Sequence, residues 1–111
     1  MAKHEFGIIK NKPISTDRFY EYEPNKYNCI QVDDGFIEPI LIDLQNVDCY
    51  WNTLKVSGKG LSYCGITLIP PESIDTLINI LSIQNNLEYI DLISLANQAK
   101  KENNYIIHFG I

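Results

Sequence analysis

The chain has 111 residues, 45% of them apolar, and a formal net charge of −5. This length fits one domain, residues 1–111, which can bury roughly two-thirds of the surface that the unfolded chain exposes. The net charge and the single arginine, Arg18, argue against nucleic-acid binding, which needs clustered Lys and Arg. Because the amino terminus lacks a signal-peptide-like apolar run and no stretch approaches the roughly 20 apolar residues of a membrane span, we expect a cytoplasmic protein with no membrane association.

The amino-terminal part of the chain predicts two strands separated by an irregular segment. Residues 4–9 (HEFGII) favour a short strand, which ends before the proline of NKPIS. Residues 17–28 crowd aromatic and charged side chains around Pro24, which disfavours helix and indicates an extended, largely solvent-facing segment. A second strand is expected at residues 29–32 (CIQV), ended by a turn at residues 33–35 (DDG) in which glycine supplies a positive φ angle.

The middle of the chain predicts a short helix and then a hairpin. Residues 36–47 (FIEPILIDLQNV) have apolar side chains at helical spacing and a proline that a first turn tolerates, although the β-branched content also permits a strand. Residues 49–56 and 61–69 are rich in aromatic and β-branched side chains, which favours two strands. Residues 57–60 (SGKG) are expected to form the turn between them.

Two amphipathic helices are expected after the buried strand at residues 65–69. Pro70 and Pro71 end that strand and start the first helix, where Glu72 suits the positive end of the helix dipole and the Ser73 hydroxyl can serve free backbone amides. The apolar stripe of this helix contains Ile74, Leu77, Ile78 and Leu81.

The second helix is expected from about residue 87 to residue 101, with Asn86 as its cap and Lys100 and Lys101 at the negative end of its dipole. Asn103 or Asn104 can take the left-handed conformation that ends it. Its apolar stripe contains Tyr89, Leu92, Ile93, Ala96 and Ala99.

The last residues, YIIHFGI, are strongly β-prone and are expected to share a sheet with residues 4–9. The predicted fold class is therefore α+β, a small mixed or antiparallel sheet with two carboxyl-terminal amphipathic helices packed on one face. Pairing of the two terminal strands could bring His4 and His108 together. We interpret them as hydrogen-bonded structural residues, because no Ser, Cys or Asp stands at a spacing typical of a catalytic family.

The remaining motifs have structural explanations, and we predict no catalytic residue, metal site or cofactor. Ser73 lacks the G-x-S-x-G setting of a nucleophile, and the lysine of SGKG is followed by Gly-Leu instead of the Ser or Thr of a phosphate-binding loop. The DDG sequence lacks the distant glutamate of a calcium loop. The three cysteines include no C-x-x-C pair, so reduced, buried structural thiols are expected at Cys29, Cys49 and Cys64.

The segment FYEYEPNKY, residues 19–27, is the candidate binding surface. Tyrosine offers a large, rigid contact area with a polar tip, and neighbouring acids steer a basic partner. Between residues 17 and 48 the chain has eight acidic and two basic residues, which favours such a partner. A solvated loop whose tyrosines pack on the domain is the competing interpretation. The predicted partner-binding residues are Tyr20, Glu21, Tyr22, Glu23, Tyr27, Asp33 and Asp34.

Residues 50–81, YWNTLKVSGKGLSYC followed by GITLIPPESIDTLINIL, resemble segments of small bacterial immunity proteins of polymorphic and contact-dependent toxin systems. The resemblance implies a single-domain inhibitor that binds one cognate toxin and performs no catalysis. The hypothesis is therefore a non-catalytic binding module that occludes a cognate toxin, or another basic protein, with an acidic, tyrosine-rich surface.

Two alternatives from other classes stay open. The first is a small enzyme with a pocket lined by Cys64, His108 or His4. The second is a homo-oligomeric subunit in which a terminal β-strand, if it lies at a sheet edge, pairs across chains.

Overall fold

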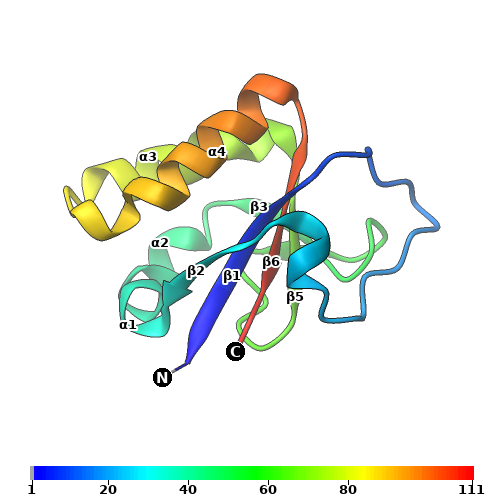
Figure 1. Ribbon diagram of the computed structural model, residues 1–111, viewed down its shortest axis with the longest axis horizontal. Coiled ribbons are helices and arrows are strands. Elements are labelled where there is room, and N and C mark those ends of the chain that lie inside the picture. Colours follow the sequence, from blue (N-terminus) through cyan, green and yellow to red (C-terminus); the bar gives the residue numbers. More distant parts are fainter. Residues whose placement is uncertain (1) are drawn as a thin grey trace.

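The computed structural model describes residues 2–111, which form an α+β fold around one six-stranded sheet (Figure 1). Every neighbouring pair of strands is antiparallel, in the order β2-β1-β6-β5-β3-β4. This confirms the predicted fold class. The strands are β1 (Lys3–Ile9), β2 (Ile30–Asp33), β3 (Asp48–Trp51), β4 (Ser57–Lys59), β5 (Ile66–Ile69) and β6 (Tyr105–Phe109).

The two terminal strands share the sheet, as predicted, and they lie side by side in its middle. Their register pairs Phe6 with His108 and Ile8 with Ile106. Because β1 and β6 each have a strand on both sides, neither terminal strand is an edge strand. The condition for the proposed oligomer, a terminal strand at a sheet edge, is therefore not met.

Side chains alternate along the central strands and so build two apolar cores, one on each face of the sheet. Phe6 and Ile106 face the core under the helices. Ile9 and Ile107 face a second core on the other side, which Phe19 and Tyr27 of the long connection after β1 help to cover. Figure 1 shows the paired helices and this blue-to-cyan connection in different parts of the molecule, with the sheet between them.

The carboxyl-terminal helices confirm their predicted apolar stripes. The helix α3 (Ile74–Ile83) follows the 3₁₀ turn η3 (Pro71–Ser73), and α4 (Ile90–Glu102) follows η4 (Leu87–Tyr89). Asn86 caps η4 by accepting a hydrogen bond from the Glu88 amide at 3.0 Å, and Asn103 ends α4 with φ 57°. The buried positions are Ile74, Leu77, Leu81, Tyr89, Leu92, Ala96 and Ala99.

Residues 36–47 are mostly helical, but as short pieces. They are α1 (Asp34–Ile37), η2 (Glu38–Ile40) and α2 (Leu41–Leu44). The 3₁₀ turn begins where Pro39, which lacks an amide proton, follows Glu38.

The prediction of a turn at residues 33–35 is wrong, because α1 begins at Asp34. Asp33 caps α1 instead, because its carboxylate accepts a hydrogen bond from the Gly35 amide at 2.8 Å, and Gly35 is a helical residue. Among residues 2–111, the one glycine with positive φ is Gly60, at 78°.

The prediction of a hairpin turn at residues 57–60 is also wrong. Ser57–Lys59 form the edge strand β4, which pairs with β3, and the chain turns earlier, after Asn52 with φ 64°. The Trp51 ring covers Gly58 so closely that an added Cβ would lie 2.2 Å from its Cε2 atom. The Trp51 indole also donates to the Gly60 carbonyl at 3.0 Å. Because Gly58 has no side chain, the Trp51 ring can lie close to β4. Gly60 supplies the positive φ angle that follows this strand.

The segment at residues 17–28 is irregular up to residue 23 and then forms the 3₁₀ turn η1 (Pro24–Tyr27), with its proline in the first turn. No helix within residues 2–111 combines the length and apolar character that a bilayer crossing requires.

Candidate functional site

The tyrosine-rich loop, residues 17–27, runs over the sheet face opposite α3 and α4 and is pinned to the turn after β3. The Phe19 amide donates to the Asn52 carbonyl, and the Asn52 side-chain amide donates back to the Phe19 carbonyl, each at 2.8 Å. Beyond this anchor, the side chains of Tyr20 and Tyr22 are 63% and 64% exposed. Glu21 and Glu23 are exposed as well. The loop therefore presents two tyrosines that alternate with two carboxylates.

Tyr22 has a second role, because its hydroxyl donates to the carboxylate of the buried Glu5 on β1. This hydrogen bond is the main cause of the raised pKa of Tyr22. The Tyr22 ring also packs edge-on against Phe109, with centroids 5.4 Å apart. Tyr22 thus holds the loop on the sheet while most of its ring stays exposed.

A groove of about 630 Å³ lies between this loop and the end of β1. Its apolar walls include Ile8, Ile9, Phe19, Tyr20 and Tyr27, and its charged residues are of both signs. The acids are Asp17, Glu21 and Glu23, and the bases are Lys10, Arg18 and Lys26. The charged residues around the groove are therefore mixed in sign.

Asp33 and Asp34 bond to residues outside the tyrosine-rich loop. Asp33 caps α1, and Asp34 turns toward the helix-side face, where it bonds to His4 and Tyr63. The Asp34 side chain is only 19% exposed. Of the predicted partner-binding residues, the loop brings together Tyr20, Glu21, Tyr22, Glu23 and the half-buried Tyr27.

His4 and His108 lie side by side, as pairing of the terminal strands allows, and they form part of a longer buried polar network. His4 Nδ1 lies 2.8 Å from His108 Nε2, and His4 Nε2 lies 2.8 Å from Asp34 Oδ1. His108 Nδ1 lies 3.0 Å from Thr67 Oγ1. Tyr63 donates to both Asp34 oxygens at 2.7 Å, and the Ser62 amide donates to Thr67 Oγ1 at 2.8 Å.

One set of proton positions satisfies every group in this network with both rings neutral. The Asp34 carboxylate only accepts, so His4 donates to it from Nε2 and accepts at Nδ1 from His108. His108 then accepts at Nδ1 from the Thr67 hydroxyl. Burial, which penalises the charged form of the ring, is the main cause that lowers the pKa of His108 from its usual 6.5 to about 3.

Tyr63 and Asp34 complete the outer end of the network. The hydrogen bond from Tyr63, followed by that from His4, lowers the pKa of Asp34. The same bond to Asp34 raises the pKa of Tyr63 to about 12. Both histidines are fully buried, so the network cross-links β1, β5, β6, α1 and the connection before β5, and its ring nitrogens are closed to substrate.

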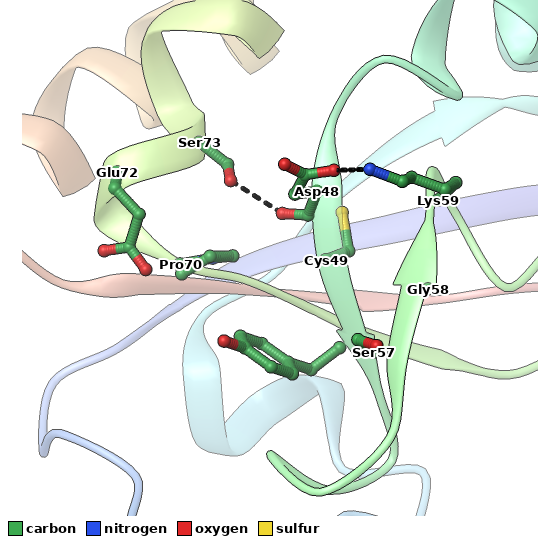
Figure 2. A pocket seen from close by; sticks show the side chains of 9 residues that line it. Asp48, Cys49, Ser57, Gly58, Lys59, Pro70, Glu72 and Ser73 are labelled. Atoms are coloured by element: carbon green, nitrogen blue, oxygen red, sulfur yellow. Dashed lines mark hydrogen bonds and ion pairs between the residues drawn. The ribbon is translucent and has the colours of Figure 1, made fainter.

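A second pocket, of about 440 Å³, lies beside the edge strand β4 (Figure 2). Figure 2 shows Lys59 reaching the Asp48 carboxylate and Ser73 pointing at the Asp48 backbone. The Ser73 hydroxyl donates to the Asp48 carbonyl at 2.6 Å. The prediction that it bonds to free backbone amides of the helix is therefore wrong. Burial raises the pKa of the Cys49 thiol to about 12. The pocket therefore holds neither an activated serine nor a thiolate.

The three cysteines are free and differ in exposure. Cys49 is buried, as expected for all three, but Cys29 is half-buried and Cys64 is exposed. Cys64 lines a hollow of about 230 Å³ beside Tyr20 and Tyr22, whereas the two histidines are enclosed in the network. The structure therefore does not bring Cys64, His4 and His108 into one pocket. Within residues 2–111, no cluster of three or more His, Cys, Asp or Glu side chains could hold a metal ion.

Comparisons of the chain with protein-family models, curated proteins and solved structures found no match. The functional evidence therefore comes from the chain's own surfaces and cavities.

The sequence indicated that strand pairing could bring the two histidines together, but it did not identify Asp34, Tyr63 and Thr67 as their partners. The alternation of side chains along a strand could have indicated which face of the sheet these partners occupy. His4, like Phe6 two residues later, points toward the helix side. The contributions of α1 and of the connection before β5 depend on tertiary packing.

Proposed function

We propose that this protein is a non-catalytic binding module, an inhibitor of immunity type that occludes a basic partner such as a cognate toxin. The observation that carries the proposal is the tyrosine-rich loop, where exposed Tyr20 and Tyr22 alternate with exposed Glu21 and Glu23 on a backbone pinned at Asn52. Tyrosine supplies large contact area at a small entropic cost. A pinned loop loses less freedom when it binds.

The charge of the chain favours a basic partner. The formal net charge of −5 provides a long-range field that raises the association rate with a positively charged protein. Arg18 and Lys26 reduce that field close to the groove. We therefore assign specificity to the tyrosines and steering to the charge of the whole molecule.

The accessible cavities favour binding over catalysis. Ser73, Cys49 and the buried histidines are engaged in structural contacts, with no base placed beside a free nucleophile among them. Small inhibitory modules need a rigid surface and no such apparatus.

The test is capture of the partner and loss of its binding in loop variants. A tagged copy, expressed at native level in the source organism and washed at moderate salt, should retain one stoichiometric basic protein identified by mass spectrometry. Tyr20→Ala should then weaken the purified complex about tenfold or more, as truncation of a central interface tyrosine does. Val56→Ala, at a residue that is 48% exposed and lies outside residues 17–27, is the control and should leave the affinity unchanged.

Tyr22→Ala is not used in this test. It would leave the buried Glu5 carboxylate without its hydrogen-bond donor and so would change the fold as well as the surface. Recovery of the bare protein while candidate partners are expressed, or equal affinity of Tyr20→Ala and Val56→Ala, would refute the proposal.

A further inference from the structure

We infer that the outer tip of the α3–α4 hairpin is a second docking surface, made for a basic protein segment that carries apolar side chains. The helical-tip surface consists of Ile83, Leu87, Glu88, Ile90 and Asp91. The inference rests on the proposed function in one respect, because it takes the partner to be a basic protein. It adds the place on the fold that the partner contacts and the apolar chemistry of the contacting segment.

Three large apolar side chains of the tip are left in solvent. The exposed fractions are 79% for Ile83, 81% for Leu87 and 52% for Ile90. Ile83 follows the buried Leu81 by two positions and so lies about 200° around α3 from the core. By the same spacing Ile90 points away from the core on α4, opposite the buried Leu92.

These residues share one end of the hairpin, the yellow end in Figure 1, which projects away from the sheet. Ile83 ends α3, and Leu87 and Ile90 open η4 and α4 only a few residues later. The spacing of three places Leu87 and Ile90 on the same face of their helical run. Packing inside this chain does not account for three such side chains within eight residues, and an exposed apolar cluster of this kind is typical of an interaction surface.

The charge around the tip is of one sign. Glu88 and Asp91 are exposed, and residues 60–99 contain no Lys, Arg or His. The α1–α2 run adjoins the same end, because the Tyr89 hydroxyl donates to the Phe36 carbonyl at 2.7 Å. That run adds Glu38 and Asp43, together with Ile42, which is 79% exposed.

The acids at this end are free to meet a partner's bases. Ion pairs with lysine among residues 2–111 engage the carboxylates of Asp48, Asp75 and Glu102, and Asp34 is bonded to His4. None of the four acids named at the tip and on the α1–α2 run belongs to that set. Lys100 and Lys101 lie at the other end of α4.

The negative charge of the helical-tip surface indicates which class of molecule binds there. A second copy of the chain would place acids against acids, and nucleic acid or an anionic membrane would be repelled in the same way. A basic protein segment with leucine-like side chains satisfies both the apolar and the acidic residues of the tip. A basic amphipathic helix has this chemistry.

The test uses a fluorescent synthetic peptide with Leu and Lys at amphipathic helical spacing, titrated against the full chain and followed by anisotropy. Ile83→Ser/Leu87→Ser should weaken binding of this peptide about tenfold. Both side chains are exposed, so the fold should be retained, and a circular dichroism melt checks this. The matched control is Ile14→Ser, at a loop residue that is 60% exposed, and it should bind like the unsubstituted chain.

A Lys peptide without Leu should bind far more weakly than the amphipathic peptide. Equal affinity of the tip variant and the control, or equal affinity for the two peptides, would overturn the inference. A dimer in analytical ultracentrifugation that the double substitution dissolves would make a second copy the occupant and also overturn it.

Failure of this inference and failure of the proposed function give different results. A captured partner that binds the tip variant normally refutes the tip surface and leaves the tyrosine-rich loop in place. Peptide binding at the tip with no captured partner refutes the proposed function and leaves the tip surface in place.

Discussion

Thr67→Val tests whether the buried polar network stabilises the fold. The substitution keeps the shape of the side chain but removes the hydroxyl that accepts from the Ser62 amide at 2.8 Å and bonds to His108 Nδ1 at 3.0 Å. Thr67 and His108 are fully buried, so the ring nitrogen would lose its partner without access to water. At about 1–3 kcal/mol for each of the two polar groups left unsatisfied, the free energy of unfolding should fall by about 2–6 kcal/mol.

Thr67→Ser is the matched control, because it keeps the hydroxyl and removes one methyl group, which costs about 1 kcal/mol. Urea denaturation followed by circular dichroism measures both variants. With a slope of about 2 kcal/mol per molar, in the middle of the range for a small domain, the Val variant should show a midpoint about 1–3 M below that of the parent. A Val variant as stable as the Ser variant would refute the claim that the network contributes to stability.

Three further predictions follow from contacts in the fold and on its surface. Because the pKa of His108 is about 3 in the folded chain against its usual 6.5, the unfolded chain takes up this proton first, so stability should be full above pH 6.5 and fall below it. Urea midpoints at pH 6.5, 5.5 and 4.5 should reveal a loss of roughly 1 kcal/mol per pH unit, and a flat profile would contradict the buried neutral ring. Gly58→Ala should destabilise the chain by about 1–3 kcal/mol because the new Cβ would meet the Trp51 ring at 2.2 Å, whereas Gly35→Ala, with its nearest atom at 3.2 Å, should cost less in the same assay. Glu21→Lys/Glu23→Lys should slow association with the captured partner at low salt in stopped-flow measurements, with little change in dissociation, and unchanged association would remove these acids from the binding surface.

Much of the secondary structure could be predicted because its signals are local. The stripe of Ile74, Leu77 and Leu81 matches the helical repeat, and this is the face that α3 buries. Asn86 and Asn103 occupy the two ends of the second helical run because a capping side chain and a left-handed stop each depend on a few neighbouring residues.

Two of the errors have a different cause, since each depended on a contact that the local sequence pattern does not specify. SGKG has turn-like composition, yet the Trp51 ring and the pairing with β3 make its first three residues an edge strand. The Ser73 hydroxyl bonds to the Asp48 carbonyl, which lies 25 positions earlier in the chain. A local pattern contains no information about such partners.

The candidate surfaces divide in the same way. Composition alone indicated an acidic chain with a tyrosine-rich segment, because charge and residue type are properties of the sequence. Only the tertiary structure decided that Asp34 leaves that segment to bond to His4 and that Arg18 and Lys26 join the groove. It also decided that exposed apolar side chains of the segment 60–99, which has no Lys, Arg or His, lie at one tip of the helical hairpin, since burial and proximity arise only when distant strands and helices pack together.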